Sequence, residues 1–123
     1  MITNTVNDRE LSLLGFGAMR LPVTEDGSID EGAVFEMVRY ASEHGVNYYD
    51  TAYPYHQGNS EVVIGKALKQ LPRESYCLAT KYPGHQIASS YHPEEIFEEQ
   101  LQKCDVEYFD YYLLHNIYDT TNK

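Results

Sequence analysis

The sequence contains no tryptophan, only two cysteines and few basic residues. Nine lysines and arginines stand against 19 aspartates and glutamates, so the formal net charge is −10. This acidity argues against nucleic acid or an anionic membrane surface as a partner. Cys77 and Cys104 lie far apart in the chain. Two such cysteines indicate buried free thiols in a reducing cytoplasm, not a disulfide framework.

Long apolar runs and secretory features are also absent. No segment is long and apolar enough to cross a bilayer, and residues 1–10 have neither the basic start nor the apolar core of a signal peptide. The 123 residues are 42% hydrophobic and 23% charged, the composition of one globular domain at most. We therefore predict a single cytoplasmic domain, with neither nucleic acid nor membrane among its partners.

Short apolar runs recur regularly along the chain. They begin near Leu13, Val46, Cys77 and Phe109, and amphipathic helical patterns fill the intervals. This rhythm is typical of a parallel sheet with crossover helices. A complete flavodoxin-like domain of similar length is an alternative. Its first loop would lead into a helix, however, and the proline at position 22 argues against that.

Three helices are predicted between these strands, and no helix follows the fourth one. Their expected caps and helix-breaking residues are, in chain order, Ser28 or Asp30 with Gly45, Asn59 or Ser60 with Pro72, and Pro93 in a first turn. The acidic residues in the third helical segment are expected to form a solvated face.

Polar residues stand where three of the predicted strands end. Asp50 follows residues 46–49, Tyr55 lies in the loop behind it, Lys81 follows residues 76–80, and His115 follows residues 109–114. Parallel α/β folds gather their functional side chains at the carboxyl ends of the strands. A carboxylate, a phenol, an ammonium and an imidazole in one place form an acid–base arrangement. We therefore predict that these four residues make up one catalytic site.

Each of these residues also has an ordinary explanation. Asp50 suits a turn, Tyr53 competes with Tyr55 for any role, Lys81 can extend into solvent, and His115 can be a hydrogen-bonded core histidine. It is less expected that four residues with unrelated ordinary roles lie in this order at three strand ends than that they belong to one site.

Two further candidates are weaker. The histidines at positions 85 and 92 lack the spacing and the cysteine partners of a metal site, so no metal is predicted. Residues 15–20 lack the third glycine of a dinucleotide-binding fingerprint and do not lead into a helix, so they do not form a Rossmann turn.

Five sequence blocks resemble the aldo-keto reductase family, in that family's order and spacing. They are residues 14–19 (LGFGAM), 50–55 (DTAYPY), 60–68 (SEVVIGKAL), 79–81 (ATK) and 110–115 (DYYLLH). The resemblance implies an α/β fold of the (β/α)8 TIM-barrel type. It also implies an oxidoreductase that uses NADP(H) to reduce the carbonyl group of small aldehydes and ketones to an alcohol.

The resemblance assigns a role to each candidate catalytic residue. Tyr55 would be the general acid that protonates the carbonyl oxygen. A free phenol loses its proton only near pH ~10, so a neighbouring ammonium, that of Lys81, would ease the transfer. Asp50 would keep Lys81 charged and aimed, and His115 would orient the carbonyl group. The nicotinamide side of the cofactor site would be lined by Gly17, Ala18, Met19 and Asp50.

The resemblance covers only about the first half of such a barrel, which takes ~250 residues in all. In the family, most cofactor contacts follow the fifth, seventh and eighth strands, which this sequence does not contain. Residues 1–123 would thus form one partial domain, the N-terminal half with four parallel strands. Two hypotheses follow: a catalytic half that carries the tetrad, or a non-catalytic truncated half-barrel that associates with itself or with a complementing half. The blocks also resemble a branch whose members often carry a C-terminal iron–sulfur segment, but no cluster is assigned here.

Overall fold

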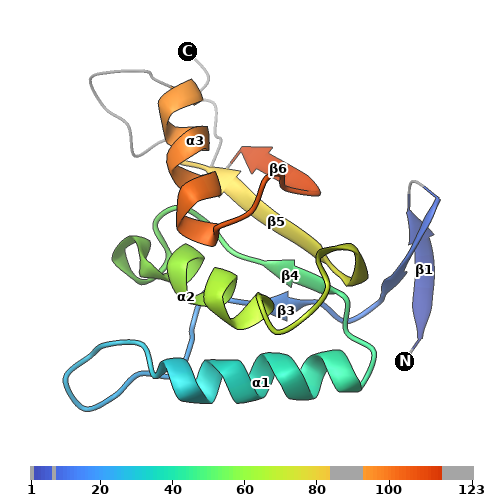
Figure 1. Cartoon of the computed structure of the whole chain (residues 1–123), viewed down its shortest axis with the longest axis horizontal. Coiled ribbons are helices and arrows are strands. Elements are labelled where there is room, and N and C mark those ends of the chain that lie inside the picture. The colour runs from blue at the N-terminus through green and yellow to red at the C-terminus, as the bar shows by residue number, and fades with distance from the viewer. Residues whose placement is uncertain (1, 7, 84–92, 115–123) are drawn as a thin grey trace.

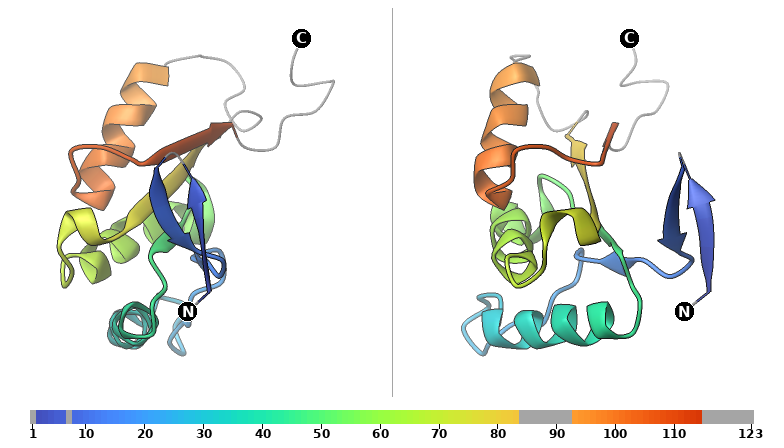
Figure 2. Two further views of the ribbon diagram at one scale, coloured as in Figure 1. Left: turned by 90° about the vertical axis from the view of Figure 1, so that its right-hand side faces the viewer. Right: turned by 45° about the vertical axis from the view of Figure 1, so that its right-hand side comes forward.

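Four short segments pair side by side as a parallel sheet, in the order in which they occur along the chain. They are β3 (Phe16–Gly17), β4 (Tyr48–Asp50), β5 (Cys77–Tyr82) and β6 (Tyr111–Leu114). The structure, a computed structural model, describes residues 2–6, 8–83 and 93–114. Within these ranges, three helices lie on one face of the sheet: α1 (Glu31–Glu43), α2 (Asn59–Leu68) and α3 (Pro93–Cys104) (Figures 1 and 2).

The sheet order decides between the two fold classes that the sequence allows. A flavodoxin-like sheet has the order 2-1-3-4-5 and carries helices on both faces. Here the order is sequential and the described helices share one face, which is how strands and helices follow one another around a barrel. The predicted α/β architecture with four parallel strands is confirmed, and the flavodoxin-like alternative is wrong.

The alternation of side chains along the strands places the core between the sheet and the helices. Tyr49 of β4 and its register partner Leu78 of β5 are fully buried on the helix side, against Val34 and Val38 of α1 and Ile64 of α2. The Tyr49 hydroxyl donates a hydrogen bond to the carbonyl of Val46. Because successive residues of a strand point to opposite faces, the neighbours of Tyr49 in β4 point to the other face, which these helices leave open.

The first predicted strand is shorter than expected. The apolar run that begins near Leu13 pairs with β4 only at Phe16–Gly17, and Leu13 and Leu14 are 63% and 61% exposed. An antiparallel hairpin, β1 (Thr3–Val6) with β2 (Arg9–Ser12), precedes it. The sequence analysis did not predict this hairpin, because all four β1 residues are exposed and no apolar alternation marks the strand.

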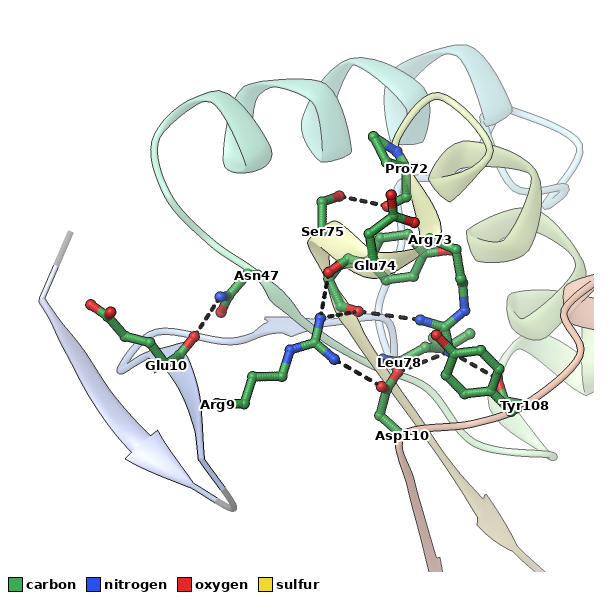
Figure 3. A network of polar contacts seen from close by, with 11 residues as sticks. Arg9, Glu10, Asn47, Pro72, Arg73, Glu74, Ser75, Leu78, Tyr108 and Asp110 are labelled. Atoms are coloured by element: carbon green, nitrogen blue, oxygen red, sulfur yellow. Dashed lines mark hydrogen bonds and ion pairs between the residues drawn. The ribbon is translucent and has the colours of Figure 1, made fainter.

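Charged contacts attach this hairpin to the end of the sheet where the strands begin. The Arg9 guanidinium donates to the Asp110 carboxylate at 3.1 Å and to the Tyr76 carbonyl at 2.9 Å, and Arg73 donates to the same carboxylate at 2.9 Å (Figure 3). The side chain of Asp110 is only 10% exposed, and its second oxygen also accepts the Leu78 amide at 2.8 Å. The hairpin therefore lies at the end of the sheet opposite to the predicted site.

The helix ends confirm two of the predicted caps and correct a third. The Asp30 carboxylate accepts the Ala33 amide at 3.1 Å, so Asp30 is the cap of α1, and Gly45 follows that helix with a positive φ of 94°. α3 begins at Pro93, as expected. Neither predicted cap of α2 acts as one, because Gly58 takes that position.

Helices α2 and α3 approach each other through their main chains at Gly65. A Cβ atom placed on Gly65 would lie 2.4 Å from the carbonyl oxygen of Cys104 and 2.7 Å from its Cα. Backbone atoms cannot turn aside as a flexible side chain can, so only glycine fits here. This contact sets how close α3, and with it β6, lies to the rest of the layer.

We expect Gly65→Ala to destabilise the fold by about 1–3 kcal/mol, because the added methyl group forces the two helices apart. Gly32→Ala in α1 is the matched control: its Cβ would meet only Asp30 Oδ1, at 3.8 Å. That substitution should be neutral or stabilise by up to about 1 kcal/mol, the usual gain of alanine over glycine in a helix. Urea unfolding of the two variants measures the difference. A Gly65→Ala chain as stable as Gly32→Ala would show that the helices do not meet this closely.

Candidate active site

Strand direction and register bring three of the predicted residues to one edge of the sheet. Gly17 pairs with Asp50, and Asp50 pairs with Ala79. Lys81 is the last residue but one of β5, two positions beyond Ala79, so its side chain projects from the same face as that of Asp50. This is the open face, at the carboxyl ends of the strands. The sequence predicts that this strand ends at residue 80, but β5 continues for two more residues, to Tyr82.

Lys81 is held by two oxygen acceptors. Its ammonium donates to Asp50 Oδ2 at 2.7 Å and to the carbonyl of Thr51 at 2.8 Å. The two side chains are 14% and 30% exposed, so the pair is partly withdrawn from water. A charge-assisted hydrogen bond in such surroundings is stronger and better fixed than one at an open surface. The two contacts hold the Lys81 side chain in one position.

Tyr55 lies beside the same ammonium. Lys81 Nζ is 5.1 Å from the centre of the Tyr55 ring, within the range of a cation–π contact. Tyr55 opens a short turn, Tyr55–Gly58, in which His56 and Gln57 adopt left-handed backbone angles with φ of 53° and 57°. Left-handed residues other than glycine cost roughly 1–2 kcal/mol each, so the surrounding structure must hold this turn in place.

A hydrogen bond to the ring of His56 helps to keep this turn in place. Its Nε2 accepts the backbone amide of Leu21 at 2.8 Å. The bond joins the Tyr55 turn to the segment that follows β3.

Tyr53 is oriented away from the pair. Its hydroxyl donates to the carboxylate of Glu99 in α3, at 3.1 and 3.2 Å to the two oxygens, and Lys103 lies over its ring. Burial and the hydrogen bond to Glu99 raise the pKa of Tyr53. Between the two candidate tyrosines, the geometry favours Tyr55 as the partner of Lys81.

The predicted cofactor-lining segment is fixed through its main chain. The Ala18 amide donates to the Asp50 carbonyl at 2.9 Å, and the Ala18 carbonyl accepts the Ser60 hydroxyl at 2.9 Å. No described heavy atom lies within 4 Å of a Cβ built on Gly17, and Met19 is 53% exposed. A rigid backbone with open space over a glycine and an exposed apolar side chain is a surface on which a flat ring can lie.

Two tyrosines form the floor of the open face next to the pair. The rings of Tyr48 and Tyr111 lie 5.7 Å apart, centre to centre. Burial, and then the charge of Asp50, raise the pKa of Tyr48. The Tyr48 phenol therefore stays protonated at neutral pH, and the two rings together give this face an amphipathic surface.

The structure brings together Asp50, Tyr55 and Lys81, three of the four predicted catalytic residues. The fourth, His115, lies outside the described residues, as do the histidines at 85 and 92. Within the described ranges, no group of three or more histidine, cysteine, aspartate or glutamate side chains is arranged to hold a metal ion.

Sequence reasoning missed a buried polar group on the other side of β5. Glu61, Thr80 and Gln100 are all fully buried between the sheet and the helices. A signal for the first of them was available, because Glu61 precedes Ile64 and Leu68 by three and seven positions and so shares their buried helical face.

The chain matches known proteins over most of its length. The model of the aldo/keto reductase family matches residues 13–122. The chain is 37% identical over 118 residues to a probable aldo-keto reductase 1 of Glycine max, in an alignment that covers 88% of this chain and 34% of that protein. It is 32% identical over 127 residues to the NADH-specific methylglyoxal reductase of Escherichia coli, covering 88% of this chain and 39% of that protein.

Solved structures show the same likeness. An aldo-keto reductase from Klebsiella pneumoniae in complex with NADPH superposes with a TM-score of 0.78 at 24% identity, over 97% of this chain and 41% of that one. The holo form of an aldo-keto reductase from Bacillus halodurans gives 0.72 at 31% identity, over 92% and 40%. The predicted TIM-barrel fold class is thereby confirmed. The chain spans about two fifths or less of the length of these relatives.

We expect the Asp50–Lys81 pair to behave as a coupled unit. Asp50→Asn should destabilise the chain by about 1–3 kcal/mol, since it leaves a largely buried ammonium with neutral acceptors and no counter-charge. Adding Lys81→Met should recover part of that loss. Lys69→Met, which removes an ion pair whose members are 54% and 83% exposed, should change stability by less than about 1 kcal/mol. A urea-unfolding double-mutant cycle gives the coupling, and strictly additive effects would mean that the pair does not form.

Proposed function

The chain belongs to the aldo/keto reductase family, and from this we propose that it carries the acid–base centre of an NADP(H)-dependent reductase of aldehydes and ketones. The observation that supports the proposal best is the 2.7 Å contact between Lys81 and Asp50, with the Tyr55 ring beside the same ammonium. The chain spans only 34% and 39% of its two curated relatives. The activity is therefore proposed for the barrel to which residues 1–123 would contribute the N-terminal half.

In this proposal, Tyr55 protonates the carbonyl oxygen of the substrate. NADP(H), when bound, supplies the hydride that adds to the carbonyl carbon. The oxygen gains negative charge as the hydride arrives, and the Tyr55 hydroxyl transfers its proton to that oxygen, which gives the alcohol. The Lys81 ammonium stabilises the phenolate that remains, and Asp50 keeps the ammonium in place. His115 keeps its proposed role of orienting the carbonyl on the strength of the sequence resemblance.

The choice of cofactor rests on the open surface at the end of β3 and on the relatives. Gly17, Ala18 and Met19, with Asp50 beside them, fit the nicotinamide end of the cofactor, because the backbone is fixed and the space over Gly17 is open. The Klebsiella pneumoniae relative is described in complex with NADPH, whereas the Escherichia coli relative is named as NADH-specific. We propose NADP(H), with a small carbonyl compound as substrate.

The proposal also places the protein in the cytoplasm. Both cysteines are buried free thiols, and burial raises the pKa of each, which leaves them unreactive. The helices in residues 8–83 and 93–114 are too short or too polar to traverse a lipid bilayer.

A second candidate function is that of a half-barrel that binds another half. Both outer strands of the sheet, β3 and β6, have one unpaired edge within the described structure. Leu113 and Leu114 of β6 are 45% and 64% exposed. A groove beside β3 combines apolar and charged side chains: Phe16, Met37 and Tyr40 with Glu36, Arg39 and Glu43. Exposed strand edges are templates for pairing with another chain. We therefore propose self-association, or pairing with a complementing half-barrel.

Tyr55→Phe tests the catalytic proposal in a chimera in which these residues replace the matching part of the Bacillus halodurans enzyme. We expect carbonyl reduction to fall by about 10²–10⁴-fold, the usual contribution of a general acid. Cofactor affinity should change by less than about twofold, since the hydroxyl acts on charge that develops only in the transition state. Tyr53→Phe is the matched control and should keep nearly full activity. Loss of activity in Tyr53→Phe, with Tyr55→Phe active, would exchange the two roles.

The 123-residue chain itself tests the second candidate. We expect sedimentation velocity to show dimers or larger species, and NADPH fluorescence to show binding at least about tenfold weaker than in the chimera. Leu114→Lys should weaken the association by placing a charge on the β6 edge. Val23→Lys alters a residue of similar exposure, 52%, away from both edges and should have no effect. A monodisperse monomer that binds NADPH as tightly as the chimera would contradict this candidate.

A further inference from the structure

A buried carboxylate lies directly behind the strand end that carries Lys81. Glu61 of α2 is fully buried, although glutamate is almost never withdrawn from water without partners. Its Oε2 accepts the Thr80 hydroxyl at 2.6 Å and the side-chain amide of Gln100 at 2.9 Å. Its Oε1 lies 2.8 Å from the ammonium of Lys103, as an ion pair without hydrogen-bond alignment.

Gln100 connects this carboxylate to the backbone of Lys81. The Nε2 of Gln100 donates one hydrogen to Glu61 and the other to the carbonyl of Lys81, both at 2.9 Å. Its Oε1 accepts the hydroxyl of Tyr112 from β6. Gln100 is fully buried, and every hydrogen-bonding group of its amide is used. Helices α2 and α3 and strands β5 and β6 all meet at this point.

Successive residues of β5 connect the two sides of the sheet. The side chain of Thr80 points to the helices and binds Glu61, while that of Lys81 points to the open face and binds Asp50. The network therefore fixes the side chain of Thr80 and the main-chain carbonyl of Lys81. The negative charge of Glu61 also adds to burial in raising the pKa of Tyr112 and of Cys104.

We propose that Glu61 is a positioning residue for Lys81. Glu61 and Gln100 hold the carboxyl end of β5 from the helix side, so that the Lys81 ammonium stays between Asp50 and Tyr55. The catalytic role of these contacts rests on the proposed reductase function. The contacts themselves belong to the 123-residue chain and their effect on Lys81 can be measured there.

The test follows the chemical accessibility of individual lysines. The chain has five lysines, at positions 66, 69, 81, 103 and 123. Brief treatment of the folded chain with acetic anhydride, followed by mass spectrometry of its peptides, gives the acetylation rate at each. Glu61→Gln keeps the shape of the side chain but turns the charge-assisted hydrogen bonds from Thr80 and Gln100 into neutral ones, which are roughly half as strong. We therefore expect the rate at Lys81 to rise about five- to tenfold, the effect of weakening buried hydrogen bonds by about 1 kcal/mol or slightly more. Lys103 should also become more reactive, and Lys66 and Lys69 should not.

The matched control is Glu31→Gln. Glu31 also pairs with a lysine, Lys66 at 3.4 Å, but the two side chains are 47% and 55% exposed. That substitution should leave the Lys81 rate unchanged. A purely structural role for Glu61 would lower the urea midpoint without changing Lys81 in the folded state. An unchanged Lys81 rate in folded Glu61→Gln would therefore overturn the proposal.

A milder variant covers the case in which Glu61→Gln does not fold. Thr80→Val removes only the hydroxyl donor to Glu61 and keeps a β-branched side chain in β5. The Lys81 rate should then rise by about twofold or more, and an unchanged rate would again overturn the proposal. Because the readout needs no turnover, a chimera that proves inactive while Lys81 responds to Glu61→Gln would refute the reductase proposal alone.

Discussion

The structure depends on keeping one ammonium charged in a place that is largely withdrawn from water. The side chain of Lys81 is 14% exposed, and an ion in such surroundings costs several kcal/mol unless it is compensated. Asp50 and the Thr51 carbonyl supply the compensation only if β4 and β5 run parallel in the observed register. A shift by one residue would turn one partner to the opposite face. The helix layer, which buries Tyr49 and Leu78 side by side, selects that register.

The end of β5 is polar on both faces, and the two faces differ in kind. On the open face, the side chains of Lys81 and Asp50 are 14% and 30% exposed. On the helix face, Glu61 and Gln100 are fully buried, Glu61 Oε2 accepts two hydrogen bonds, and Glu61 Oε1 lies against the Lys103 ammonium. A buried polar network of this kind resists movement, because opening it would leave further polar groups unpaired in a low dielectric. The end of β5 is thus held firmly on the helix face and is partly exposed on the open face.

Much of this arrangement could be predicted from the sequence. The positions of Asp50 and Lys81 and the four parallel strands follow from apolar runs that end in polar residues. For the first helix the sequence left Ser28 and Asp30 as alternative caps, and the structure selects Asp30. Local sequence patterns do not predict features that depend on contacts between residues far apart in the chain. The hairpin β1–β2 has no apolar alternation and is attached by Arg9. Helix α2 has Gly58 at its N-cap, and the Ser60 hydroxyl donates to the Ala18 carbonyl instead of capping the helix. The burial of Glu61 was not predicted, because a charged residue in a helix is ordinarily expected on a solvated face.

The contact between Arg9 and Asp110 joins residues that are 101 positions apart in the chain. During synthesis the hairpin emerges from the ribosome well before its anchor, Asp110, is made. At synthesis rates of about 5–20 residues per second, the hairpin must wait roughly 5–20 s for Asp110. During that interval Arg9 has only the two backbone carbonyls of residues 74 and 76 to bind, and these too appear late. The hairpin is therefore secured only after the three strands that follow it have been made, and a nascent chain halted before Asp110 would carry the hairpin undocked.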